Sequence, residues 1–245
     1  TVIMASTDGN VETEMEVLRD LYEKRIEGLF YVNFFGGADH VAFLYGRSVP
    51  TVIFGERIYD PPMDAVGTYG AGRATLRIVR HLVACGRSRI GYVGGPLSTA
   101  VGRMRYGQFQ RAMTEAGVKV QQSLVALSEF TATGGQQAFE AIAPHRPDAV
   151  VAGNDLMAIG VLREAQRRGL RVPEDLAVVG YDDIELASMI APSLTTVSIP
   201  KYEIGRAGAE LLFDRIAGVV KEPTHIALRR EPSFGSRLLS RRLTP

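Results

Sequence analysis

Residues 173–183 read Pro-Glu-Asp-Leu-Ala-Val-Val-Gly-Tyr-Asp-Asp, and this stretch indicates the fold more clearly than any other. Residues 176–179 form a short apolar run, which is typical of a strand buried in a parallel sheet. Gly180 interrupts the run, and Asp182 and Asp183 follow where the strand should end. In open α/β sheets, ligands bind just beyond the carboxyl ends of the strands. The two carboxylates are therefore either ligand contacts or ordinary turn residues.

Similar apolar runs alternate with amphipathic helical segments along most of the chain, which predicts an α/β fold with parallel sheets covered by helices on both faces. The predicted strands include residues 2–5, 28–32, 51–54, 90–93, 124–127, 149–152, 176–179, 195–199 and 224–228. The predicted helices include residues 11–25, 71–84, 104–116, 133–142, 156–168 (with Asp155 as N-cap) and 203–217. About ten strands could form one large open sheet or two smaller ones. Residues 61–68 are predicted to be a loop that crosses between two lobes, and Pro200 a return crossing.

The composition argues against several classes of protein. The 245 residues carry 28 basic and 27 acidic side chains, so bulk charge gives no grip on DNA or on an anionic membrane. Cys85 is the only cysteine, which fits the reducing cytoplasm. No apolar run approaches the roughly 18 residues that span a bilayer, and we expect no signal peptide. The sequence shows no histidines at metal-ligand spacing, no nucleophile elbow and no Walker loop, so we predict no metal, cofactor or catalytic residue.

Polar and aromatic side chains follow the predicted strands, where a parallel sheet would bring them to one edge. They are Ser98, Thr99, Arg105, Phe130, Asn154 and Asp182. A flat apolar ring with an arginine, an amide and a carboxylate suits a sugar or a similar small polar ring. Each side chain also has an ordinary interpretation. Phe130 could be core, Asn154 a helix cap, and Arg105 a solvated helix residue.

Several longer segments match a known pattern in order and spacing. They include Thr-Asp-Gly-Asn at 7–10, Val-Pro-Thr-Val-Ile at 49–53, Ile-Gly-Tyr-Val-Gly-Gly-Pro-Leu at 90–97, Arg-Met-Arg-Tyr-Gly-Gln-Phe at 103–109, Gly-Asn-Asp-Leu-Met-Ala-Ile-Gly at 153–160, Gly-Leu-Arg-Val-Pro-Glu-Asp at 169–175 and Val-Gly-Tyr-Asp-Asp at 179–183. Together they resemble the effector-binding core of the LacI/GalR family of bacterial transcription regulators. The resemblance covers nearly the whole chain.

The resemblance implies two Rossmann-like lobes of periplasmic-binding-protein type, joined by three crossovers, with an effector in the cleft. We expect an N-terminal lobe of residues 1–68 plus about 201–228, and a C-terminal lobe of residues 69–200 plus about 229–245. It also implies that the effector contacts are Arg105, Phe130, Asn154 and Asp182, with Asn33, Thr99 and Ser98 as weaker matches. This sequence is expected to start at the second core strand, without the helix-turn-helix domain of a full family member.

The predicted function is the effector-sensing part of a cytoplasmic, homodimeric DNA-binding repressor that performs no chemistry. Operator DNA would be bound only through the missing N-terminal domain. The first alternative is a periplasmic sugar-binding protein of a transport system, and the second is an enzyme that uses Asp182 with Arg105. The run at 173–183 is more typical of the regulators, and no nucleophile, metal set or cofactor loop supports an enzyme.

Overall fold

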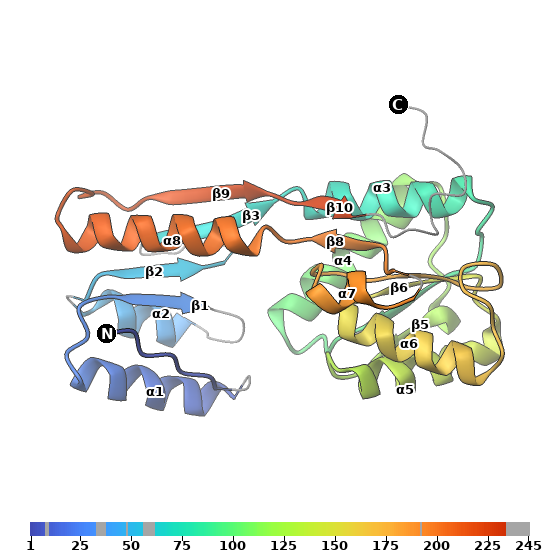
Figure 1. Cartoon of the computed structure of the whole chain (residues 1–245), viewed down its shortest axis with the longest axis horizontal. Coiled ribbons are helices and arrows are strands. Elements are labelled where there is room, and N and C mark those ends of the chain that lie inside the picture. Colours follow the sequence, from blue (N-terminus) through green and yellow to red (C-terminus); the bar gives the residue numbers. More distant parts are fainter. Residues whose placement is uncertain (8–9, 33–37, 48, 56–61, 192, 234–245) are drawn as a thin grey trace. The chain divides into compact units, whose positions relative to one another are not determined.

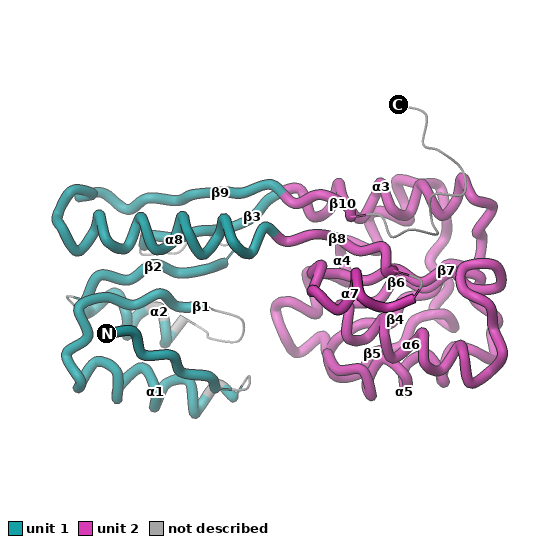
Figure 2. The backbone as a smooth tube through the Cα atoms, in the orientation of Figure 1, with its two compact units in different colours: residues 1–69, 200–229 teal, residues 70–199, 230–245 magenta. Residues whose placement is uncertain are grey.

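The computed structural model describes the chain except residues 8–9, 33–37, 48, 56–61, 192 and 234–245. The chain divides into two compact units (Figure 2). Unit 1 comprises Thr1–Tyr69 and Pro200–Arg229, and unit 2 comprises Gly70–Ile199 and Arg230–Pro245. The backbone therefore passes from one unit to the other three times along the sequence.

Unit 1 contains a four-stranded parallel sheet with the order β1-β2-β3-β9 (Figure 1). Its strands are β1 Leu29–Val32, β2 Thr51–Phe54, β3 Asp64–Tyr69 and β9 His225–Arg229, and its helices are α1 Val11–Glu23, α2 Ala38–Tyr45 and α8 Lys201–Ile216. Tyr31 and Ile53 pack with Leu18 of α1 and Leu44 of α2. Helix α8 contacts all four strands.

Two predictions for unit 1 are wrong. Residues 2–5 form no strand, and residues 64–68 of the predicted crossing loop 61–68 lie in strand β3, in the interior of the sheet. Pro61, Pro62 and Gly67 made this segment look like a loop. The structure accommodates Asp64 in the strand because Arg215 of α8 binds its carboxylate at 2.6 and 2.7 Å. A Cβ at Gly67 would lie 2.5 Å from the carbonyl oxygen of Gly55, so only glycine fits there.

Unit 2 contains a second four-stranded parallel sheet, with the order β5-β4-β6-β7. Its strands are β4 Ile90–Gly94, β5 Val125–Leu127, β6 Ala149–Ala152 and β7 Ala177–Val179, and a separate antiparallel pair is formed by β8 Thr196–Ser198 and β10 Glu231–Ser233. Its helices are α3 Ala71–Ala84, α4 Ala100–Glu115, α5 Ala132–Ile142, α6 Asp155–Arg167 and α7 Glu185–Met189. The α/β class and the two lobes with parallel sheets are confirmed.

The side-chain alternation of a strand explains how unit 2 builds its core. Tyr92 and Val151 pack in one cluster with side chains of α3 and α4. Their neighbours Val93 and Val150 pack in a second cluster with side chains of α5 and α6. Both faces of the sheet are therefore covered. This explains why its strands read as continuous apolar runs.

Candidate functional site

The candidate site lies in unit 2, at the carboxyl ends of β4, β6 and β7. Strand β7 ends at Val179, and the chain then continues through Gly180 and Tyr181 to Asp182. A Cβ at Gly180 would lie 2.1 Å from an oxygen of Asp155, so glycine is required for the chain to pass there. Asp182 and Asp183 both have positive φ, at 110° and 54°. Such conformations cost about 1–3 kcal/mol each outside glycine and concentrate at ligand-binding sites.

Arg105 of α4 and Asp182 form the centre of the site. Arg105 Nη2 donates to Asp182 Oδ1 at 2.6 Å, and Nη1 donates to Oδ2 at 3.4 Å and to the carbonyl oxygen of Gly153 at 2.5 Å. The Arg105 side chain is 9% exposed and that of Asp182 is 24% exposed. A guanidinium that is buried this deeply must be paired, and a carboxylate that is still partly open can also be reached by a ligand. Arg105 is therefore not the solvated helix residue of the ordinary interpretation.

Two aromatic rings contact the Arg105 guanidinium. Its central carbon lies 4.1 Å from the centroid of the Tyr181 ring and 5.6 Å from that of Phe130, both within the range of cation–π attraction. Phe130 is half-buried beside a row of glycines. A Cβ at Gly95 would lie 2.1 Å from its ring, and one at Gly153 would lie 3.2 Å from it. The ring is thus both part of the packing and adjacent to the charged pair.

Asn154 begins helix α6. Its Oδ1 accepts a hydrogen bond from the Met157 N–H at 2.8 Å, and its Nδ2 donates to the Phe130 carbonyl at 3.1 Å. Asn154 is therefore the N-cap, and the prediction that Asp155 caps this helix is wrong. The amide also ties α6 to the segment that carries Phe130.

Asp155 is fully buried behind the site, where it binds the loop that follows β7. Its carboxylate accepts from the Ile184 N–H at 2.9 Å and from the Thr196 hydroxyl at 2.6 Å. Burial raises the pKa of Asp155 to about 6; the two hydrogen bonds oppose this effect, and the charges of Asp182 and Asp183 add to it.

The weaker matches have different surroundings. Thr99 is the N-cap of α4, where its hydroxyl accepts from the Gly102 N–H at 3.0 Å and donates to the Pro96 carbonyl at 2.8 Å. Ser98 is exposed, and its carbonyl accepts from Arg103 at 2.7 Å. Asn33 lies outside the residues that the structure describes.

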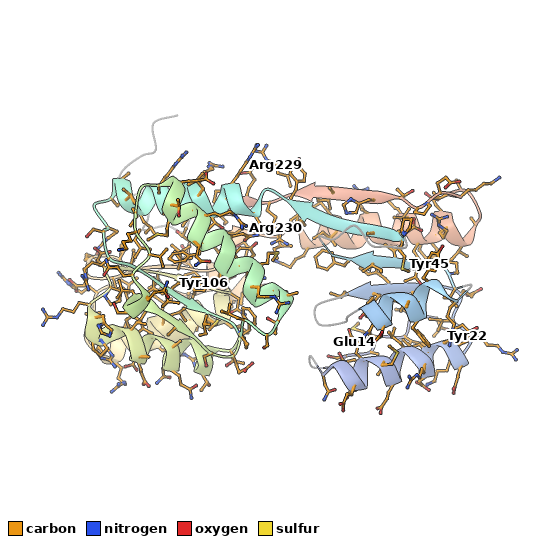
Figure 3. All side chains as sticks on the ribbon, turned by 180° about the vertical axis from the view of Figure 1, so that it is seen from behind. Glu14, Tyr22, Tyr45, Tyr106, Arg229 and Arg230 are labelled. Carbon is orange, nitrogen blue, oxygen red and sulfur yellow. The ribbon has the colours of Figure 1, made fainter. Side chains whose placement is uncertain are left out.

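Sequence reasoning missed Tyr181 and Arg230. Buried Arg230, labelled in Figure 3, directly precedes β10 and donates a hydrogen bond to the Tyr181 hydroxyl. That hydroxyl also donates to Gln108 of α4 at 3.4 Å. Tyr181 stood inside the segment that indicated the site, but no local pattern connects it with an arginine 49 positions later.

Neither a metal centre nor a membrane span is evident in the described part of the chain. Its residues include no group of three or more His, Cys, Asp or Glu side chains placed to hold a metal ion. Among its helices, none combines the length and the apolar character that crossing a membrane requires.

Comparison with known proteins identifies the family. Residues 79–234 match the family model described as a periplasmic binding protein-like domain. The chain is 33% identical over 238 residues to the HTH-type transcriptional repressor PurR of Escherichia coli O139:H28, covering 92% of this chain and 67% of PurR. The chain belongs to the LacI/GalR family. It is the effector-sensing core of a repressor rather than a transport protein.

Solved structures agree with this assignment to the LacI/GalR family. A complex of the transcriptional regulator CelR with cellobiose is 31% identical, with a TM-score of 0.79, and the match covers 91% of this chain and 69% of CelR. A regulatory protein of the LacI family from Chloroflexus aggregans is 28% identical, with a TM-score of 0.82, and the match covers 95% and 83% of the two chains. PurR and CelR are both transcription regulators.

Proposed function

We propose that this LacI/GalR-family core binds a small polar ring, such as a sugar, at the carboxyl edge of the unit 2 sheet. The ligand would contact Arg105, Phe130, Asn154 and Asp182. The observation that carries the proposal is the Arg105–Asp182 pair, a deeply buried cation held by a carboxylate that is still partly open. Such a pair offers N–H donors and carboxylate acceptors side by side, which suits ligand hydroxyl groups that both donate and accept.

Phe130 supplies the apolar surface that a ring requires. Its ring lies close to the Arg105 guanidinium, and the neighbouring glycines leave room for it. Asn154 also holds the Phe130 segment, because its Nδ2 donates to the Phe130 carbonyl while its Oδ1 caps helix α6. The amide keeps a second N–H and a second lone pair for a ligand. The sugar class is supported by the relative CelR, which was solved with cellobiose.

The proposed mechanism is linkage between the effector and the conformation of the two-unit core. An effector that binds one conformation better raises its population, with a coupling of about 1–3 kcal/mol in typical cases. The resulting change would reach operator DNA through a helix-turn-helix domain outside this sequence. A symmetric homodimer in the cytoplasm would suit palindromic operators. Ser98, Thr99 and Asn33 remain predictions as further contacts.

A binding screen tests the proposal. Thermal shift is measured with cellobiose, glucose, galactose, ribose, adenine and hypoxanthine, and compounds that stabilise the protein go to calorimetry. Asp182→Asn is expected to lower the affinity of a true effector about 10- to 100-fold, because hydrogen bonds to charged groups contribute roughly 1.5–3 kcal/mol.

The matched control is Asp175→Asn. Asp175 also pairs with an arginine, Arg171, at 2.6 Å, but it precedes β7 whereas Asp182 follows it. The control should bind like the wild type. Equal affinity in both variants would remove Asp182 from the effector site, and a screen in which no ring compound binds would argue against the sugar class.

A further inference from the structure

A small cavity lies inside unit 2 beside Arg105. Its volume is about 10 Å³, close to the minimum that holds one water molecule. Much of its lining is apolar, with contributions from Ile78, Phe109, Val151 and Val179. Arg105 and Tyr92 also line it. Thr75 and Tyr181 add further polar groups to the lining. The cavity is therefore a mostly hydrophobic space that both Tyr92 and Arg105 line.

Both of these residues carry a buried polar atom that has no hydrogen-bond partner among the described residues. The atoms are the Tyr92 hydroxyl oxygen and Arg105 Nε. Tyr92 is 1% exposed. A buried polar atom without a partner destabilises the folded state, and such atoms are rare in native proteins. Both atoms belong to residues that line the same cavity, which indicates a shared partner.

The Tyr92 ring is fixed by its neighbours. It stacks on Phe109 with a centroid distance of 4.9 Å and packs against Tyr106 at 5.2 Å. A Cβ at Gly94 would lie 2.9 Å from its hydroxyl oxygen, so this oxygen lies at the carboxyl end of β4. Tyr92 and Arg105 are linked geometrically because both line the same cavity. The Arg105 charge also opposes the rise that burial causes in the pKa of Tyr92.

We propose that the cavity binds one water molecule whose oxygen accepts a hydrogen bond from Arg105 Nε and is hydrogen-bonded to the Tyr92 hydroxyl. Arg105 Nη1 is held by the Gly153 carbonyl and Nη2 by Asp182. The water would accept from Nε, the third guanidinium nitrogen. All three nitrogens of Arg105 would then have a hydrogen-bond partner, which fixes the orientation of the guanidinium plane. Tyr92 is thus a positioning residue for Arg105. Its importance for the effector rests on the proposed function, but the water site itself does not.

The test uses the chain without effector. Arg105 Nε–H is observed by proton–nitrogen NMR, and its signal is assigned by its loss in Arg105→Lys. In the wild type we expect a cross-peak between this N–H and a long-lived water. In Tyr92→Phe the cross-peak should disappear, and Nε–H exchange should become about 10-fold faster, the equivalent of one neutral hydrogen bond. The control is Tyr106→Phe, which changes the adjacent half-buried tyrosine (Figure 3) and should leave both readouts unchanged.

Three outcomes would overturn the proposal: no water cross-peak in the wild type, unchanged exchange in Tyr92→Phe, or equal acceleration in Tyr106→Phe. If Tyr92→Phe does not fold, a high-resolution crystal structure of the wild type decides, because it must show an ordered oxygen between the two atoms. Since no effector is present, these results are independent of the binding screen. The water site and the effector site can therefore fail separately.

Discussion

Asp155→Asn is expected to stabilise unit 2 at neutral pH, although it alters a buried, hydrogen-bonded side chain. The side chain is 0% exposed, and the pKa of Asp155 is raised from 3.8 to about 6, mainly by burial. At pH 7 the folded protein therefore holds a carboxylate that its surroundings disfavour. Asparagine has the same shape without the charge. Its oxygen can accept from the Ile184 N–H and its amide can donate to the Thr196 oxygen, so both existing contacts keep a partner.

The magnitude follows from the pKa difference. A rise from 3.8 to about 6 is about 2 units, and each unit corresponds to 1.36 kcal/mol, so the carboxylate costs up to roughly 3 kcal/mol at neutral pH. The folded state binds more protons than the unfolded state between these two values. The contribution of Asp155 to stability must therefore fall as the pH rises through this window and change no further above it.

Urea unfolding at several pH values between 4 and 7.5 measures this effect. The stability of Asp155→Asn relative to the wild type should increase across this pH range and reach a gain of up to roughly 3 kcal/mol at pH 7. Asp175→Asn is the control, because Arg171 lowers the pKa of Asp175 to about 2 and its titration lies below this range. The reasoning would be refuted if Asp155→Asn were less stable than the wild type at pH 7 and its unfolding free energy depended on pH as in the wild type. The folded protein would then favour the charged carboxylate over a neutral side chain.

Three further substitutions test the packing and charge of the two units by urea unfolding. Asp182→Asn should destabilise unit 2 by roughly 1–3 kcal/mol, because Arg105 loses its charged partner. In a double-mutant cycle with Arg105→Met, the losses in unfolding free energy should not add. If they add strictly, the two side chains do not interact. Gly160→Ala should cost about 1–3 kcal/mol, since its Cβ would lie 1.9 Å from a carbonyl oxygen of α5, and no loss of stability would mean looser helix packing. Arg215→Met leaves the buried Asp64 carboxylate without its cation and should cost about 3–5 kcal/mol, with the loss confined to the transition of unit 1.

The sequence predicted the elements whose apolar pattern has a single interpretation. Strands β4, β6 and β7 are short apolar runs, and their burial on both faces explains the pattern. Strand β3 was missed because Pro61, Pro62 and Gly67 give residues 61–68 the pattern of a loop. What makes Asp64 acceptable there is Arg215, which is 151 positions later in the sequence. No local pattern contains that information.

In the candidate site, too, local sequence patterns predicted some features, while others depend on contacts between distant segments. The carboxylate at the end of β7 was predicted from local order alone, since polar residues after a parallel strand lie at the ligand-binding edge. The pairing of Asp182 with Arg105 depends on how α4 packs against the sheet. The N-cap of α6 was assigned to Asp155 instead of Asn154, because both are good N-cap residues and the sequence does not say which one turns into the core. The structure decides this by burying Asp155 against Gly180.

The Arg105–Asp182 pair also limits which ligands the proposed site can accept. Before a ligand binds, the two side chains already satisfy each other at 2.6 Å. A ligand that only donates, or only accepts, would replace half of that interaction and leave the other charge poorly paired in a buried place, at a cost of several kcal/mol. A ligand with neighbouring hydroxyl groups can accept from the guanidinium and donate to the carboxylate at the same time. The binding free energy is then the difference between the free protein, in which Arg105 and Asp182 pair with each other, and the complex, in which both pair with the ligand. Selectivity arises because a ligand that can pair with only one of the two residues binds with a penalty.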